Sequence, residues 1–349
     1  MIRKEVELLA PYAVKVYPCR IKLNQNESPF EPSEDAKKEF VRRLGEIGWC
    51  RYPALVPKSQ IAKTAEFAGW IEDGVLMGNG SNEILSSIFL GFLERGRSVV
   101  ISQPTYTLYK ILAQTLGVTV HDVMMTQDFA FDVDRLILTA NQSKASLIVL
   151  CSPNNPTGAQ LGASEVQRIL ESTQSTLLLD EAYVHFAPAN MVPLLSRYER
   201  LIIMQTFSKA IGAAGVRFGY ALCWPDVARQ IEKIMLPYHV NVFTLLAIDI
   251  LMDDRAYIQK CVELLKSERT RMLAGLSAIP GVRPHPSEGN YMMFEVLKRK
   301  PADVFQSLAD RGILIRDVSS YPMLQRALRV TIGAPDENRE FLWALREVV

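Results

Sequence analysis

The sequence is poor in the residues that would build a disulfide framework or a metal site. Its 349 residues include only five cysteines and four histidines, and these form no C-x-x-C, H-x-x-H or HExxH pattern. An odd number of widely spaced cysteines does not suit a disulfide framework and favours a reducing compartment. So few scattered ligands also give no reason to expect a protein-bound metal.

Strong charge and long apolar runs are lacking as well. The chain carries 39 lysines and arginines against 38 acidic residues, so its net charge of +1 gives no reason to expect nucleic acid or an anionic membrane as a partner. The first residues, MIRKEVELLAPYAV, mix both signs of charge and lack an apolar signal core. The longest apolar stretches are too short for a membrane span. We therefore expect a cytoplasmic enzyme or binding protein.

No repeat, low-complexity segment or Pro/Gly/Ser-rich linker divides the chain. Its length fits one large domain and one smaller domain. Residues 1–31, which are rich in Pro and Asn, predict an extended arm. Residues 32–252 predict the large domain and residues 253–349 the small one, with a helix from about residue 253 to 278 as the hinge.

Short apolar runs alternate with helical patterns along the large domain. Strands buried on both faces are predicted at 98–102, 146–151, 176–180, 201–206 and 219–224. Helices are predicted at 82–96, 164–173 and 225–236, with Asn82, Ser164 and Asp226 as amino-terminal caps or first-turn acids. This alternation predicts an α/β fold with a mostly parallel sheet covered on both sides. The small domain is predicted as α+β, with strands at 291–296, 313–318 and 328–333.

Four polar clusters fall at the ends of predicted strands, where open α/β sheets bind their ligands. They are MGNGSNE (77–83), SPNNPTG (152–158), Asp180 and TFSKAIGAAGVRFG (206–219). Each cluster alone has an ordinary structural explanation, such as a turn, a helix cap or a solvated lysine. Together, in this order, they predict an anion-binding site that carries a lysine.

These motifs resemble those of the fold-type I aminotransferases that depend on pyridoxal phosphate (PLP). Five further motifs share the resemblance, namely LAPY, KLNQNESPF, RYP, DEAYVHF and LRVTIG. The histidinol-phosphate aminotransferase family is the most similar branch, and the resemblance covers nearly the whole chain. It implies a homodimer with shared active sites. It also implies reversible amino transfer between L-histidinol phosphate and 2-oxoglutarate, a step of histidine biosynthesis.

The resemblance also implies roles for the residues around the cofactor ring. Lys209 is similar to the Schiff-base lysine, which afterwards moves a proton between substrate Cα and cofactor C4′. Asp180 is similar to the carboxylate that keeps the pyridine nitrogen protonated. Tyr183 and Asn155 resemble the pair that binds the phenolic oxygen, and Tyr106 the aromatic residue stacked on the ring.

The cofactor phosphate needs several hydrogen-bond donors. By resemblance these are the backbone N–H groups of Ser81 and Asn82 at a helix start, the hydroxyls of Thr206 and Ser208, and the guanidinium of Arg217. Tyr52 in RYP resembles the residue that reaches the phosphate from the neighbouring subunit. Gln205 departs from the pattern, because many relatives have an arginine there.

Substrate choice is read from the remaining anion-binding groups. Arg329 resembles an arginine that contacts the substrate phosphate in the histidinol-phosphate branch, and Arg316 and Tyr12 resemble its partners. Asn155 is expected to contact the substrate as well as the cofactor. Two arginines and a phenol suit a phosphate of about −1.5 to −2 charge. The alternative for Arg316 is a surface ion pair with Asp317 or another acid.

Three other functions fit parts of this pattern. An aromatic amino-acid aminotransferase would share the motifs, and so would a PLP-dependent threonine-phosphate decarboxylase, although KLNQNESPF argues against the latter. The third is a non-catalytic PLP-fold binding protein. Regulators of that kind usually carry a DNA-binding segment, and the sequence has neither the extra length nor a basic helix-turn-helix candidate.

Overall fold

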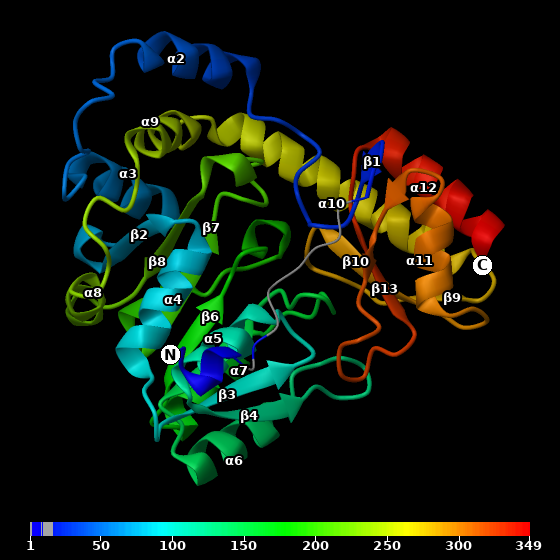
Figure 1. Cartoon of the computed structure of the whole chain (residues 1–349), viewed down its shortest axis with the longest axis horizontal. Coiled ribbons are helices and arrows are strands. Elements are labelled where there is room, and N and C mark those ends of the chain that lie inside the picture. Colours follow the sequence, from blue (N-terminus) through cyan, green and yellow to red (C-terminus); the bar gives the residue numbers. More distant parts are fainter. Residues whose placement is uncertain (1, 8, 10–16) are drawn as a thin grey trace.

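The computed structural model describes residues 2–7, 9 and 17–349 (Figure 1). A seven-stranded sheet forms the core of one part of the molecule and a four-stranded sheet the core of the other, and helix α10 (Arg255–Ser277) runs between them. The expected α/β fold with a mostly parallel sheet is confirmed. Within the described ranges, no helix is both long and apolar enough to cross a membrane.

The large sheet contains one reversed strand near its edge. Its spatial order is β2 (Val75–Asn79), β8 (Phe218–Leu222), β7 (Leu201–Thr206), β6 (Thr176–Asp180), β5 (Leu147–Cys151), β3 (Ser98–Gln103) and β4 (Thr119–Met124). From β7 to β4 neighbouring strands are parallel, whereas β8 is antiparallel to both β2 and β7. The sequence pattern identified β3, β5, β6, β7 and β8 to within two residues, but it gave no range for β2, missed β4 and did not indicate the reversal of β8.

This reversal gathers chain segments at one edge of the sheet. Since β2 and β7 both oppose β8, they run in the same direction and end at the same edge as β6, β5 and β3. The reversed β8 begins there, so Arg217, which immediately precedes it, lies at that edge too. All the polar clusters therefore meet in one place.

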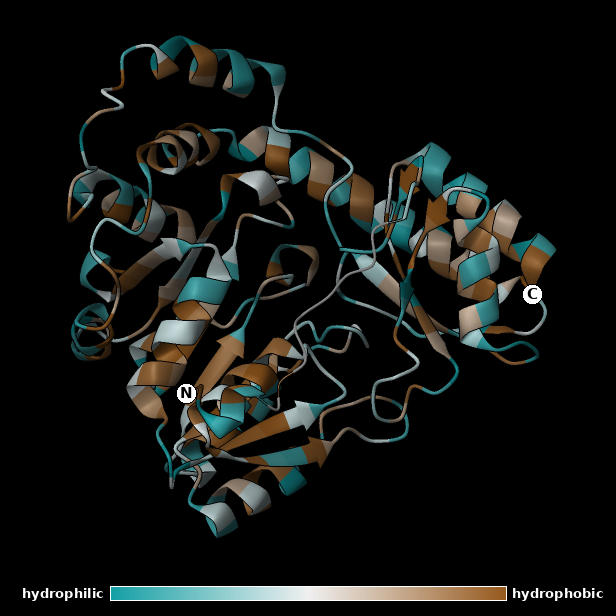
Figure 2. Cartoon of the chain, in the orientation of Figure 1, coloured by the Kyte–Doolittle hydropathy of each residue, from teal (hydrophilic) through white to brown (hydrophobic). Residues whose placement is uncertain are grey.

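Helices cover the sheet on both faces (Figure 1). They are α3 (Lys58–Ala68), α4 (Ser81–Phe92), α5 (Leu108–Leu116), α6 (Val133–Ser143), α7 (Ala163–Ser172), α8 (Pro225–Glu232) and α9 (Val242–Leu251). Every residue of β5 and β7 is buried, and Figure 2 shows the sheet strands as largely hydrophobic. Continuous apolar strands of this kind are typical of parallel sheets covered on both sides.

The second sheet is antiparallel, in the order β12 (Arg316–Asp317), β13 (Ala327–Thr331), β10 (Tyr291–Val296) and β9 (Val282–Pro284). Helices α10, α11 (Pro301–Ala309) and α12 (Pro335–Val348) pack together beside it. The predicted strand 313–318 is two short strands, since β11 (Ile313–Leu314) pairs with the amino-terminal β1 (Ile21–Lys22) while β12 pairs with β13. The described residues 17–33, which lie between α1 (Lys4–Glu7) and α2 (Glu34–Leu44), are thereby attached to the carboxyl-terminal part of the chain through β1.

Two of the predicted helix caps are wrong. Helix α4 begins after Gly80 and α7 after Gly162, so Asn82 and Ser164 lie inside the first turn. At α7 the carboxylate of Glu165 instead accepts the N–H of Gly162 at 2.7 Å. Asp226 is in the first turn of α8, where an acid is favourable.

Gly219 lets the start of α4 lie directly against β8. A Cβ atom there would lie well inside the van der Waals contact distance of the backbone nitrogen of Ser81, so the two segments would have to separate. We expect Gly219→Ala to lower the melting temperature by several degrees, because overpacking costs about 1–3 kcal/mol. Gly215→Ala is the matched control, since nothing lies within 4 Å of a Cβ at that position. Thermal melts of equal midpoint for the two variants would contradict this account.

Candidate active site

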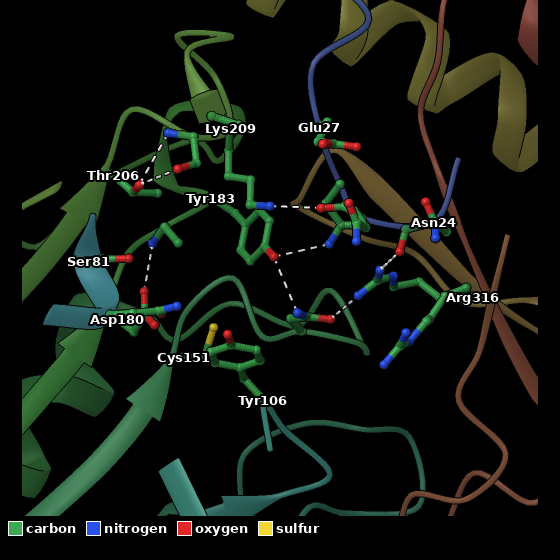
Figure 3. Close-up of a pocket in the computed structure, with 18 of the residues that line it drawn as sticks. Asn24, Glu27, Ser81, Tyr106, Cys151, Asp180, Tyr183, Thr206, Lys209 and Arg316 are labelled. Carbon is green, nitrogen blue, oxygen red and sulfur yellow. Dashed lines mark hydrogen bonds between the residues drawn. The ribbon is translucent and has the colours of Figure 1, made fainter. Parts of the chain in front are cut away.

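A cavity of about 290 Å³ lies at the edge where the strands converge. Figure 3 shows its side chains pointing toward one another from both parts of the molecule. Twelve of the fourteen predicted site residues line it: Ser81, Asn82, Tyr106, Asn155, Asp180, Tyr183, Thr206, Ser208, Lys209, Arg217, Arg316 and Arg329. The structure thus brings together residues that are up to 248 positions apart in the chain (329 − 81).

Lys209 follows β7 and extends into the cavity (Figure 3). Its Nζ donates to the backbone carbonyl of Gln25 at 2.8 Å, so the amino-terminal segment contacts the predicted nucleophile. Burial lowers the pKa of Lys209 to about 8, and the positive charges of Arg329 and Arg217 act in the same direction. The neutral amine, the form that can attack a carbonyl, is therefore far more populated near neutral pH than for an ordinary lysine, although the protonated form still predominates at pH 7.

Asp180 ends β6, the middle strand of the seven. Its Oδ2 accepts a hydrogen bond from the hydroxyl of Tyr109 at 2.6 Å, and its Oδ1 accepts one from the N–H of Ala182 at 3.0 Å. Burial raises the pKa of the Asp180 carboxyl, whereas both hydrogen bonds and the charge of Lys209 lower it. The site therefore contains a buried carboxylate with fixed donors on both oxygens.

Tyr183, three residues later, has its hydroxyl between two amides. Asn26 Nδ2 lies 3.1 Å and Asn155 Nδ2 3.3 Å from its oxygen. Burial raises the pKa of the Tyr183 phenol, so it remains protonated and can donate a hydrogen bond. Asn155 also accepts from Arg329 Nη1 at 2.5 Å. A continuous set of hydrogen bonds thus joins the loop after β5, the arm and β13.

The start of α4 lies beside a group of cationic and hydroxyl donors. Free backbone N–H groups in the first turn of a helix bind anions well. Arg217 has a φ of 59°, in the left-handed region that side chains rarely adopt, and its Nη1 lies 3.5 Å from Ser208 Oγ. The Thr206 hydroxyl lies 3.1 Å from the Ser208 hydroxyl. Gly80 has a φ of 81°, which favours glycine, and a Cβ there would also displace the Arg217 guanidinium.

Two arginines face each other across β12 and β13. Arg316 and Arg329 are direct partners in the antiparallel register, and both line the cavity. Burial lowers the pKa of Arg329, which donates to the carbonyl of Asn24 at 2.6 Å. Among the residues that the structure describes, Arg316 forms no ion pair with Asp317 or another acid, and Asp317 accepts instead from the N–H of Ser319 at 2.8 Å. Like charges placed directly opposite each other destabilise a sheet unless an anion compensates them.

Of the two remaining predicted site residues, one does not line the cavity of this chain and the other is not among the described residues. Tyr52 is 81% exposed and stacks on Tyr238 with ring centroids 4.7 Å apart. Tyr12 lies outside the described residues.

Several cavity residues were missed at the level of sequence. Asn24, Asn26 and Tyr109 make the contacts described above, and Tyr321 and Cys151 also line the cavity. Asn26 has a φ of 54°, which asparagine tolerates better than most residues. The sequence offered one usable signal, because Tyr109 lies three positions after Tyr106, a spacing that brings side chains together where the chain turns into a helix.

Gln205, the departure from the family pattern, is buried one residue before the end of β7. Its amide donates to Glu181 Oε2 at 2.8 Å and accepts from the Tyr220 hydroxyl at 2.6 Å. Burial raises the pKa of Glu181 to about 7, although the hydrogen bonds from Met191 and Gln205 act in the opposite direction. This network lies behind Asp180 and Thr206 and does not line the cavity.

Comparison with known proteins agrees with this geometry. The profile of the family described as aminotransferase class I and II matches residues 20–345. A histidinol-phosphate aminotransferase of Chlorobaculum tepidum is 34% identical over 350 residues, covering 100% of both chains. One from Prosthecochloris aestuarii is 37% identical over 92% of this chain and 89% of that relative.

Among solved structures, the histidinol-phosphate aminotransferase from Sinorhizobium meliloti in complex with pyridoxal-5'-phosphate has a TM-score of 0.89 at 24% identity. It covers 99% of this chain and 97% of its own, and at that identity the likeness concerns the fold. The resemblance inferred from the sequence motifs and the expected fold-type I architecture are both confirmed. Since the family profile spans nearly the whole chain, the protein belongs to the class I and II aminotransferases.

Proposed function

We propose that this protein is a histidinol-phosphate aminotransferase, which uses PLP to transfer an amino group reversibly between L-histidinol phosphate and 2-oxoglutarate. The observation that carries the choice of substrate is the opposed pair Arg316 and Arg329 at the cavity. Two adjacent guanidinium groups match the charge of a phosphate dianion better than that of a single carboxylate. The named relatives support the same assignment.

The donors of the cavity fit each polar group of PLP. Asp180 is the acid for the pyridine nitrogen, while Tyr183 and Asn155 are donors for the phenolic oxygen. The α4 start, with Ser81 and Asn82, would hold the phosphate together with the hydroxyls of Thr206 and Ser208 and the guanidinium of Arg217. Tyr106 lies beside Tyr109 and is the candidate for ring stacking.

Bound PLP supplies an electron sink for the electrons released at substrate Cα. The protein residues then have separate tasks. Lys209 would hold the cofactor and would also be the group that moves a proton to and from substrate Cα, for which a pKa near 8 is well placed. Asp180 would face the ring nitrogen and favour its protonated form. Arg329 and Arg316 bind the substrate phosphate, and Asn155 lies between the cofactor and substrate groups.

We also propose a homodimer in which Tyr52 completes the partner's phosphate site. Trp49, Tyr52, Leu236 and Tyr238 are large apolar side chains that are 40% or more exposed, and the two tyrosines stack on each other. Exposed apolar patches of this kind mark protein–protein contacts.

Within each subunit we retain the division into an arm (1–31), a large domain (32–252) and a small domain (253–349). The five free cysteines suit a cytoplasmic enzyme.

The covalent attachment tests the proposal most directly. Borohydride treatment of the PLP-loaded enzyme should leave a pyridoxyl group on Lys209, detected by peptide mass spectrometry and missing in Lys209→Ala. Attachment of PLP to the cofactor-free protein should accelerate as the pH rises through about 8, because the neutral amine becomes dominant above that pH. An adduct on a different lysine would contradict the assignment.

Arg316→Ala should discriminate between substrates. We expect kcat/KM for histidinol phosphate to fall by about tenfold or more, since a hydrogen bond to a charged group contributes about 1.5–3 kcal/mol. With phenylalanine as donor and 2-oxoglutarate as acceptor, kcat/KM should change much less. Arg311→Ala removes an exposed arginine at the end of α11 and serves as the control. Equal losses for both donors would refute the phosphate role of Arg316 and favour an aromatic amino-acid aminotransferase.

Leu236→Glu should weaken the dimer, because it places a charge in the exposed apolar patch around Tyr238. Sedimentation velocity over a range of concentrations measures the shift toward monomer, and activity should fall with it. Leu138→Glu is the control, because Leu138 is also exposed but lies on α6, which packs on β3 and β4 at the other end of the sheet. A wild-type protein that sediments as a monomer would rule out the shared site.

A further inference from the structure

We propose that Tyr109 is a positioning residue for the cofactor, holding Asp180 ionised and oriented so that the ring nitrogen of PLP keeps its proton. This inference rests on the proposed use of PLP and assigns a residue outside the set inferred from the motifs. The observation behind it is a direct hydrogen bond from the buried Tyr109 hydroxyl to Asp180 Oδ2 at 2.6 Å.

The direction of this hydrogen bond follows from the chemistry of the two groups. Burial raises the pKa of the Tyr109 phenol well above its ordinary value, so the phenol keeps its proton and acts as the donor. A distance of 2.6 Å is typical of an O–H group donating to a charged oxygen. Tyr109 therefore favours the carboxylate form of Asp180, which burial alone would disfavour.

Both oxygens of Asp180 are constrained from opposite sides. The N–H of Ala182 fixes Oδ1 and the Tyr109 phenol fixes Oδ2, so the carboxylate cannot rotate without breaking a hydrogen bond. The backbone contact belongs to the strand end itself, whereas Tyr109 comes from α5 on a different segment. Tyr109 is thus the side chain that fixes the carboxylate plane relative to the cavity.

Tyr109 also contacts the ring expected to stack on the cofactor. Its ring meets that of Tyr106 edge to face, with centroids 5.5 Å apart. Both residues belong to the segment at the start of α5, where the N–H of Tyr109 donates to the carbonyl of Tyr106 at 3.4 Å. Tyr109 therefore contacts both Asp180, the proposed partner of the pyridine nitrogen, and Tyr106, the residue proposed to stack on the ring.

The other titratable groups around Asp180 do not replace this donor. They are Lys209, Cys151, Tyr183, Tyr291 and Glu181. The Lys209 amine donates to Gln25, the Cys151 thiol to the carbonyl of Pro153, and Tyr291 to the carbonyl of Asn154. Tyr183 accepts from Asn26 and Asn155, and the Glu181 carboxylate accepts from Met191 and Gln205.

The test compares two cofactors in cofactor-free protein. In Tyr109→Phe we expect the dissociation constant for PLP to rise by about ten- to a hundredfold, as for a lost hydrogen bond to a charged group. The deaza analogue, in which a C–H group replaces the ring nitrogen, should bind wild type and variant with affinities within about twofold of each other, because it has no ring proton to hold. Binding is followed by absorbance, so the readout does not depend on turnover.

Tyr220→Phe is the matched control. Its hydroxyl is equally buried but donates to Gln205, outside the cavity, so affinity for both cofactors should match wild type. If Tyr109→Phe does not fold, fluorotyrosine at position 109 keeps the ring and strengthens the donor. The ring proton of the bound cofactor should then be held more strongly. The pH at which the absorbance spectrum reports its loss should therefore rise.

The outcomes distinguish a failure of the proposed function from a failure of the role proposed for Tyr109. If wild-type protein binds no PLP, the proposed function fails. This inference is overturned if wild type binds PLP but Tyr109→Phe weakens the binding of PLP and of the deaza analogue by the same factor. It is also overturned if the substitution weakens the binding of neither cofactor, because Tyr109 would then only pack against its neighbours. An unshifted spectrum with fluorotyrosine would overturn it as well.

Discussion

A buried carboxylate at the end of the central strand is the constraint on which the site depends. Asp180 is only 6% exposed, and a charge in such a place is stable only with fixed donors and a compensating cation. The donors are Tyr109 and Ala182, and Lys209 is the nearby cation of the protein. The surrounding segments are arranged to satisfy this one group.

The reversed strand β8 solves a geometric problem for the same site. Parallel strands deliver only their carboxyl ends to the ligand-binding edge. Because β8 is antiparallel, the residue that precedes it, Arg217, also reaches that edge, and β2 is turned so that α4 begins there. The donors proposed for the cofactor phosphate, which belong to α4 and to the loop after β7, thus line the same cavity. Gly80 and Gly219 allow the close approach that this arrangement needs.

Positive charge accumulates around the cavity beyond what the protein itself compensates. Arg217, Arg316, Arg329 and Lys209 line it, while Asp180 and Glu27 are its acids. Burial and the charges of Arg329 and Arg217 lower the pKa of Lys209, and Arg316 has no acidic partner among the described residues. Such an arrangement reduces stability locally and is compensated when anionic groups bind. It suits a site that takes a cofactor phosphate and a substrate phosphate together.

The sequence by itself determined five strands of the large sheet, the long helix and the polar clusters at strand ends, since these depend on local periodicity and turn chemistry, but it missed β4 and β9. Resemblance to a family then assigned Lys209, Asp180, Tyr183 and Asn155. Only the tertiary structure decided that β8 is reversed, that Arg316 lies opposite Arg329, and that Asn26 and Tyr109 contact Tyr183 and Asp180. Strand direction, register and contacts between distant segments follow from packing over the whole core, which leaves no local pattern in the chain.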